Sequence, residues 1–148
     1  MERCLYNSVL TGMSIDGKSF TYVNQLASSD GYPSKREDWF ECACCPPNVA
    51  RVLGHLSGYI YTAKTESAAS TTVNVHLFAA STLEYKLEGN DGKSFRLTQT
   101  TNYPWDGEVA FELDTDPEVE VAVRVRIPGW AESYEVRTPT NRLFTCFN

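Results

Sequence analysis

The residues best suited to chemistry lie together in the run Trp39-Phe40-Glu41-Cys42-Ala43-Cys44-Cys45-Pro46-Pro47-Asn48. The adjacent thiols of Cys44 and Cys45 come directly before a predicted helix, whose N-terminal field stabilises negatively charged sulfur. Thiolates act as nucleophiles and as ligands of soft metals such as zinc. Composition alone leaves two interpretations open: a metal or reactive-thiol site, or buried cysteines that pack as small inert hydrophobic residues.

A closed structural zinc site is not predicted from the sequence. Such a site needs four ligands, commonly two separated pairs of Cys or His. Cys4 and Cys146 are isolated and do not form a second pair. Five cysteines, three of them within four residues, also make a poor disulfide framework, so we expect reduced thiols. We expect His55 and His76 to be structural or surface residues rather than ligands.

Two predicted helices and a turn should position these thiols. Apolar residues at helical spacing predict a helix over 2–10, ended by Gly12. This helix has no N-cap residue, which leads us to expect further residues upstream. Alternation on both sides of Asp16-Gly17 predicts a hairpin over 13–24. A second helix begins at Pro46-Pro47 and should end at Gly58, with one apolar face. That face comprises Val49, Val52, Leu53 and Leu56.

From Tyr59 onward the apolar period changes to two, which predicts strands. The predicted strands centre on residues 73–77, 83–87, 95–97, 109–113 and 119–127, with a turn at Asn90-Asp91-Gly92. Seven acids between Asp106 and Glu120 are interpreted as a solvated strand face, some of them opposite Arg124 and Arg126. This pattern favours a mainly β chain with an antiparallel sandwich. The composition changes near Tyr61, which suggests two regions, 1–60 and 61–148.

Composition excludes several function classes. The chain has 148 residues, of which 42% are hydrophobic, so it is neither disordered nor fibrous. Its net charge of −6 argues against nucleic-acid or anionic-membrane partners, which require clustered Lys and Arg. No apolar run reaches the ~20 residues of a membrane-spanning helix. The start Met1-Glu2-Arg3 does not resemble a signal peptide, so we expect a cytoplasmic protein.

Five blocks of the sequence, taken in order, resemble a known enzyme family. They are ERCLYN, GMSIDGKSFTYVN, WFECACCPPNVARVLGHLSGYIYT, NYPWDG and VRIPGWA. They are similar to successive blocks of glycoside hydrolase family 127, the β-L-arabinofuranosidases, up to about Val136. Within them, CACCPPN is highly specific, because adjacent cysteines before a double proline have no generic structural purpose.

The resemblance implies a zinc-dependent retaining glycosidase whose nucleophile is a zinc-bound cysteine thiolate. It implies that Cys44 is the nucleophile and a zinc ligand, and that Cys45 is a second zinc ligand. Cys42 matches a neighbouring family cysteine of less certain role. Glu2 and Tyr22 match positions that hydrogen-bond the sugar, an arabinofuranoside. Without the resemblance, Glu2 would be interpreted as a solvated helix charge and Tyr22 as a half-buried aromatic residue.

The family pattern also implies parts that this sequence does not contain. Residues 1–60 would be the C-terminal remnant of an (α/α)6 barrel catalytic domain, and 61–148 an incomplete β-sandwich. The acid/base glutamate and two further zinc ligands, a glutamate and a cysteine, would lie upstream of this sequence. At Asn24 the sequence reads Asn-Gln-Leu-Ala where the family favours Asn-Pro-Leu-Glu, and the end, RTPTNRLFTCFN, does not continue the family pattern. We therefore expect this chain alone to be weakly active or inactive.

Two other functions remain open at this stage. The chain could be a non-catalytic β-sandwich that binds carbohydrate or a protein partner, or a thiol–metal module whose missing ligands come from another subunit of a homo-oligomer. Trp105, in the block NYPWDG, could stack on a sugar, although a packed turn aromatic is the more economical interpretation.

Overall fold

The computed structural model describes the chain except residues 24, 43, 88, 90–91, 139–143 and 148. The chain divides into two compact units, Met1–Leu56 and Ser57–Asn148, and each is described by itself. Within the described residues, every helix is too short or too polar to traverse a lipid bilayer.

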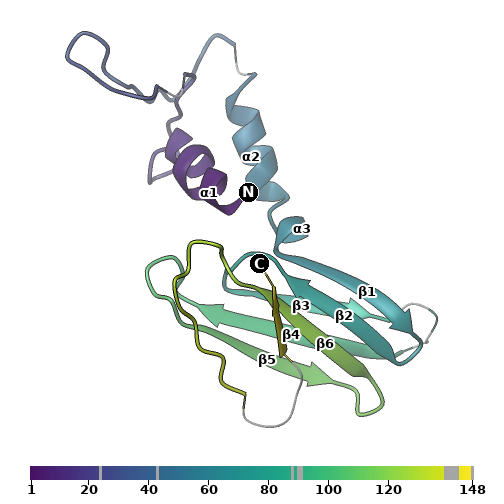
Figure 1. The fold of residues 1–148 in the computed structure, drawn as a ribbon. Helices are drawn as coiled ribbons and strands as arrows, with labels where there is room; N and C mark the ends of the chain where they lie inside the picture. Colours follow the sequence, from purple (N-terminus) through teal and green to yellow (C-terminus); the bar gives the residue numbers. More distant parts are fainter. Residues whose placement is uncertain (24, 43, 88, 90–91, 139–143, 148) are drawn as a thin grey trace. The chain divides into compact units, whose positions relative to one another are not determined.

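The first unit begins with a continuous helical segment that changes its winding twice. It comprises α1 (Glu2–Cys4), the π-helical turn η1 (Leu5–Val9) and the 3-10 turn η2 (Leu10–Gly12) (Figure 1). Leu5 is buried, and the backbone becomes extended at Met13 after Gly12. The predicted helix over 2–10 is therefore confirmed, with its end at Gly12.

The predicted hairpin over 13–24 is replaced by a turn with one bridge. Gly17 has φ +71°, a conformation that glycine adopts without steric cost, and its amide donates to the Ser14 carbonyl. Within the described residues of the predicted hairpin, Met13 and Phe20 form the single antiparallel bridge. Phe20 bridges Glu37 on its other side, so a distant segment takes the place of a longer hairpin strand. Asn24 lies outside the described residues.

The second helix of this unit, α2, spans Pro46–Gly54. Its predicted apolar face is confirmed, since Val49, Val52, Leu53 and Leu56 are all half-buried. The helix ends at Gly54 and not at Gly58, because glycine is a poor helix former and the His55 backbone leaves the helical region. Proline at the first helical positions costs no hydrogen bond there.

The second unit opens with a helical turn, α3 (Ser57–Ile60), and continues as strands. Its strands, within the described residues, are β1 (Tyr61–Ser67), β2 (Ser70–Val75), β3 (Ser81–Lys86), β4 (Ser94–Thr101), β5 (Val109–Thr115), β6 (Glu120–Arg126) and β7 (Phe144–Phe147). They form a four-stranded sheet in the order β1-β2-β6-β7 and a three-stranded sheet in the order β3-β4-β5. The prediction of a mainly β chain is confirmed.

Strand direction follows the prediction in three of the pairings. The pairs β1–β2, β3–β4 and β4–β5 are antiparallel. The pairs β2–β6 and β6–β7 are parallel. Between β2 and β6 the chain leaves the first sheet, builds the second sheet and then returns. The predicted turn at Asn90-Asp91-Gly92 lies in part outside the described residues.

One hydrophobic core joins the two sheets face to face. The fully buried members come from β2 and β6 of one sheet, from β4 of the other and from the adjoining segments. They are Val73, Val75, Leu87, Phe95, Leu97, Val119, Val123 and Val125. The alternation that the sequence shows in these strands is the alternation of buried and exposed side chains expected of a sheet with one covered face.

The acidic face is exposed as predicted, but its cross-strand partners differ. Glu112 and Asp114 are exposed on β5, which pairs with β4 and not with β6. Asp114 consequently lies opposite Arg96, whereas Arg124 and Arg126 belong to the other sheet. The expected pairing across to Arg124 and Arg126 is therefore wrong, because the chain crosses between sheets after β5.

Gln99 on β4 is a buried polar residue that links the two sheets. It is 1% exposed, and its Nε2 donates to Tyr61 Oη on β1 at 3.0 Å. Tyr61 Oη also lies 2.9 Å from Ser81 Oγ. Among the described residues, Gln99 Oε1 finds no hydrogen-bond partner, and leaving such a buried atom unpaired costs about 1–3 kcal/mol.

Gln99→Leu should therefore lower the free energy of unfolding less than substitutions at buried positions usually do. The substitution removes the unpaired oxygen at similar volume, and Tyr61 keeps Ser81 as a partner. We expect its free energy of unfolding to stay within about 1 kcal/mol of wild type, whereas Gln99→Ala should lose about 2 kcal/mol or more through a cavity. Urea unfolding followed by circular dichroism measures both values. A Gln99→Leu chain less stable than Gln99→Ala would contradict this account.

Candidate functional site

The thiol pair of the first unit lies at the start of α2. Cys45 occupies the N-cap position, and the sulfurs of Cys44 and Cys45 lie 3.3 Å apart. Cys44 is exposed and Cys45 is half-buried. The two sulfurs therefore contact each other directly at an accessible helix N-terminus, where negative charge is stabilised.

Tyr22 meets this pair from a segment distant in the sequence. Its Oη lies 3.5 Å from Cys44 Sγ. The Tyr22 ring also packs against the Phe40 ring, with centroids 5.3 Å apart and an interplanar angle of 44°. Phe40 thus supports the phenol from the segment that leads into the cysteines. Two of the predicted site residues, Tyr22 and Cys44, are brought together by the fold.

A polar network behind the pair holds the backbone of Cys44. Asn48 Nδ2 donates to the Cys44 carbonyl at 2.8 Å, and Arg51 Nη1 donates to Asn48 Oδ1 at 2.9 Å. Asn48 and Arg51 are not among the site residues predicted from the sequence. Their spacing was the available signal, because an Asn four residues after Cys44 and within the first turn of α2 can reach back to the preceding carbonyl.

The pKa values of the three groups are shifted by their mutual contacts. The pKa of Cys44 is lowered, first by the Tyr22 hydrogen bond and then by those of Cys45 and Cys42. The pKa of Cys45 is raised, chiefly by its hydrogen bond with Cys44. The pKa of Tyr22 is raised, because its phenol donates to Cys44 and ionisation beside the thiolate is unfavourable. Cys44 is therefore the sulfur that ionises first, and Tyr22 is a stable proton donor to it.

The thiol pair suits zinc in donor type and spacing, as one half of a site. Two thiolates on tetrahedral zinc, with Zn–S bonds near 2.3 Å, lie about 3.8 Å apart, close to the 3.3 Å observed here. Thiolate sulfur is a preferred zinc ligand. Among the residues that the structure describes, no group of three His, Cys, Asp or Glu side chains gathers to complete such a site.

Glu2, the remaining predicted sugar-binding residue, lies in α1 and is only 6% exposed. Burial, first, and the charge of Glu2, second, raise the pKa of the Tyr6 phenol on the next turn. Glu2 is therefore an inward-facing carboxylate of the helical segment, which differs from a solvated helix charge. Its contact with sugar stays a prediction.

Cys4, Cys42 and His76 are further residues of types that can ligate a metal. Cys4 and Cys42 are exposed free thiols, as expected for a reduced chain. The His76 Nε2 lies 2.9 Å from Thr62 Oγ1 on the neighbouring strand, in agreement with a structural role.

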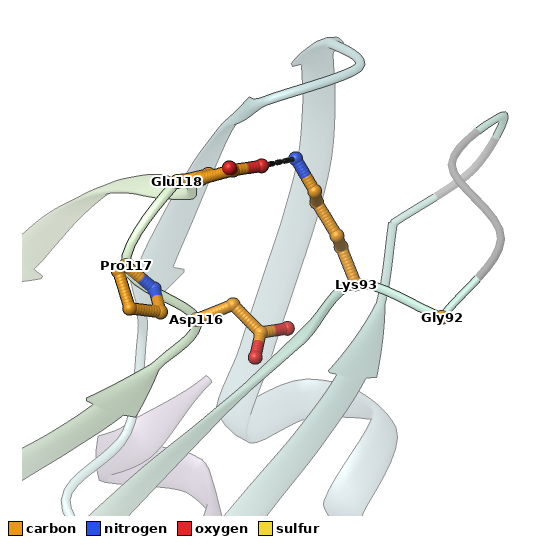
Figure 2. A pocket seen from close by; sticks show the side chains of 5 residues that line it. All are labelled: Gly92, Lys93, Asp116, Pro117 and Glu118. Carbon is orange, nitrogen blue, oxygen red and sulfur yellow. Dashed lines mark hydrogen bonds and ion pairs between the residues drawn. The ribbon is translucent and has the colours of Figure 1, made fainter.

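A pocket of about 410 Å³ lies in the second unit, whereas the site residues predicted from the sequence all belong to the first unit. Its lining residues are Gly92, Lys93, Asp116, Pro117 and Glu118 (Figure 2). Lys93 Nζ reaches across to Glu118 Oε2 at 2.6 Å, and this hydrogen bond lowers the pKa of Glu118. Asp116 accepts from the Ser94 amide. Lys93 and Glu118 are thus paired with each other and Asp116 with a backbone amide, and we assign no ligand to the pocket.

Trp105 departs from the expected packed turn aromatic. Its side chain is 86% exposed, although the surrounding turn is ordered by a hydrogen bond from the Trp105 amide to the Asn102 carbonyl. The block NYPWDG ends β4 with a turn whose backbone bonds are local, so the indole is not needed to hold it. The expectation of packing is therefore wrong.

Comparison with known proteins places both units among the glycoside hydrolases. Residues 1–58 match the model of the β-L-arabinofuranosidase GH127 catalytic domain, and residues 72–142 match the model of the GH127 middle domain. Together the two models cover most of the chain. The chain belongs to glycoside hydrolase family 127.

Similar proteins agree with this family. The chain is 37% identical over 145 residues to a non-reducing end β-L-arabinofuranosidase of Bifidobacterium longum subsp. longum. A crystal structure of a GH127 β-L-arabinofuranosidase from Geobacillus stearothermophilus matches 90% of the chain at 35% identity, with a TM-score of 0.71. A second structure, described as a glycoside hydrolase, matches 89% at 35% identity, with a TM-score of 0.72.

The chain is much shorter than these relatives. The match to the Bifidobacterium protein covers 88% of this chain but 20% of that protein. The chain covers 21% and 22% of the two solved chains. The chain thus spans about a fifth of the length of the relatives that it matches.

Proposed function

We propose that this chain provides the nucleophile-bearing part of a zinc-dependent, retaining glycoside hydrolase that acts on β-L-arabinofuranosides. The observation that carries the proposal is the contact of Tyr22 Oη with Cys44 Sγ at 3.5 Å, beside Cys45. Membership of family 127 and the β-L-arabinofuranosidase activity by which two relatives are named support the substrate class.

The proposed first step is attack of the Cys44 thiolate on the anomeric carbon of the sugar. A carbon–sulfur bond forms, the bond from that carbon to the leaving oxygen breaks, and an acid protonates the leaving oxygen. The family resemblance assigns this acid to a glutamate outside the present sequence. The same glutamate, now deprotonated, takes a proton from water as the water oxygen attacks the anomeric carbon, the carbon–sulfur bond breaks, and both the thiolate and the protonated acid are restored. Two displacements give net retention.

The chain's own residues prepare this nucleophile. Tyr22 and Cys45 lower the pKa of Cys44, and Asn48 fixes its carbonyl at the helix start. Cys44 and Cys45 would hold zinc, and the bound ion would keep their sulfurs deprotonated at neutral pH. The remaining ligands would come from outside this sequence. Because the acid also lies outside, we expect the chain alone to hydrolyse ordinary arabinofuranosides weakly or not at all.

A substrate that needs no acid separates the nucleophile from the missing group. Dinitrophenolate leaves without protonation, so a dinitrophenyl β-L-arabinofuranoside tests the first displacement alone. With zinc present, we expect mass spectrometry to find one added pentosyl group on the Cys44 peptide. Cys44→Ser should lose the adduct, and Cys42→Ser should keep it. An adduct on Cys42 or Cys45, or none on a zinc-loaded chain, would overturn the assignment of Cys44.

Metal binding is a separate prediction with its own readout. Cobalt(II), a spectroscopic substitute for zinc, should give a thiolate charge-transfer absorption on titration into the chain. Cys44→Ser and Cys45→Ser should each weaken this binding by about tenfold or more, since each removes one of two ligands. Cys4→Ser is the matched control and should bind as wild type does. Equal affinity in all variants would show that the pair is not the ligand set.

A further inference from the structure

Three aromatic rings of the second unit, those of Phe78, Tyr103 and Trp130, contact one another, and Trp105 lies two residues after Tyr103 in the same turn; we call these four residues the aromatic ledge. Phe78 lies between β2 and β3, Tyr103 and Trp105 lie between β4 and β5, and Trp130 follows β6. Connections from both sheets therefore meet there. None of these residues takes part in the thiol site.

The rings of the ledge are ordered by contact with one another. The Tyr103 and Trp130 rings stack nearly parallel, with centroids 6.4 Å apart and an angle of 21°. Phe78 meets Tyr103 edge to face at 5.5 Å. The inner part of the ledge is thus a packed aromatic row, while Trp130 stays 47% exposed and Trp105 is almost fully exposed.

The backbone beneath the outer tryptophan is also fixed. Thr101 Oγ1 donates to the Glu108 carbonyl at 2.7 Å and accepts from the Tyr103 amide at 3.1 Å. The Glu108 amide donates to Asp106 Oδ1 at 3.0 Å. An ordered turn that presents an exposed indole is preorganised for a ligand, because little conformational freedom remains to be lost on binding.

The size of the ledge suits a small flat ligand better than a protein. Two indoles offer at most about 500 Å² of surface. A stable protein interface buries about 800 Å² on each partner. An exposed aromatic patch of this smaller size is typical of a ligand-binding surface.

The charge of the turn that carries Trp105 narrows the class of ligand further. Residues 102–108 contain Asp106 and Glu108 and no Lys or Arg. Around Trp105, such a turn disfavours phosphate, sulfate and nucleic acid. It offers carboxylate and amide oxygens, which accept hydrogen bonds from hydroxyl groups. An apolar ring face beside hydrogen-bond acceptors matches a neutral sugar, whose C–H face is apolar and whose rim carries hydroxyls.

We propose that the aromatic ledge binds a neutral glycan chain, with one sugar ring stacked on Trp105 and the neighbouring part of the chain on Trp130. The choice of an arabinose-containing glycan rests on the proposed function, whereas the ledge itself does not depend on Cys44. The site would hold a polymeric substrate near the enzyme without taking part in bond cleavage.

Tryptophan fluorescence tests the proposal in a Trp39→Phe, Cys44→Ser chain. Trp105 and Trp130 are then the remaining tryptophans, and the proposed nucleophile is absent. The probe is a neutral arabino-oligosaccharide. We expect a saturable change of emission, an affinity at least about fivefold weaker in the additional variant Trp105→Ala, and partial retention in Trp105→Phe. Because cleavage is not measured, failure of the proposed nucleophile leaves this result unchanged.

Three outcomes would overturn the proposal that the aromatic ledge binds a glycan. The first is an absence of saturable emission change at millimolar oligosaccharide. The second is unchanged affinity in a Trp105→Ala chain whose circular dichroism matches that of its parent. The third is an emission change that follows protein concentration instead of glycan concentration, because a second copy of the chain would then cover the indoles.

Discussion

Cys44 is expected to be alkylated several-fold to about tenfold faster than Cys45 at neutral pH when metal is chelated. The thiolate is the reactive form, and an ordinary thiol is only a few per cent ionised at pH 7. The Tyr22, Cys45 and Cys42 hydrogen bonds lower the pKa of Cys44, whereas the Cys44 contact raises the pKa of Cys45. A lower pKa also reduces the nucleophilicity of each thiolate, so each pKa unit of separation is worth about threefold in rate.

The pH dependence gives the sign of the effect. A lowered pKa means that the thiolate of Cys44 forms at a lower pH. Its alkylation rate should therefore rise at a lower pH than the alkylation rate of free N-acetylcysteine does. The Cys45 rate should rise at higher pH than that of N-acetylcysteine. At high pH, where both groups are thiolates, the order of the two rates should reverse, because the Cys45 thiolate with its higher pKa is the stronger nucleophile. Iodoacetamide pulses, followed by mass spectrometry of the cysteine peptides, measure both profiles. Profiles in the reverse order would contradict the hydrogen-bond arrangement.

Tyr22→Phe tests the largest single cause of this shift. Loss of the phenol should raise the pKa of Cys44, move its profile to higher pH and slow its alkylation at neutral pH. Tyr32→Phe is the matched control, because Tyr32 is an exposed tyrosine of the same unit and its backbone pairs with Ser29. An equal change in both variants would indicate a general effect on the unit and not the Tyr22 contact.

The thiol pair could be predicted from sequence because its members are adjacent. Neighbouring residues before a helix start must lie close together, whatever the rest of the chain does. The contact of Tyr22 with Cys44 spans 22 residues and depends on how the intervening loop returns. Local patterns contain no information on that return. Only the family resemblance singled out Tyr22, and it did so as a sugar contact.

The strands show the same division between local and distant information. Alternation identified β2 to β6, because each buries one face. It gave little sign of β1, where the strand is mostly Thr, Ser and charged residues and only its half-buried face meets the core. It also could not show that β6 returns beside β2, since pairing depends on the crossover between sheets. The exposure of Trp105 likewise depends on whether distant segments cover its turn, and the local sequence does not show this.

Leu97→Ala is expected to destabilise the second unit strongly. Leu97 is 0% exposed on β4, the central strand of its sheet, with Leu83 and Leu113 in register on either side. It belongs to the cluster that also contains Val73 and Val123 of the opposite sheet. Truncation of such a leucine removes contacts to both layers and leaves a cavity, at a cost of about 2.7–5 kcal/mol.

This loss is large against the total stability of a small domain, which is about 5–15 kcal/mol. Urea unfolding followed by far-ultraviolet circular dichroism should show a lower midpoint for Leu97→Ala, with the slope unchanged. Thr100→Ala is the matched control on the same strand, because Thr100 is exposed and its truncation leaves no cavity. Similar midpoints for the two variants would mean that the sheets do not share the core described here, since Leu97 lies at the centre of that core.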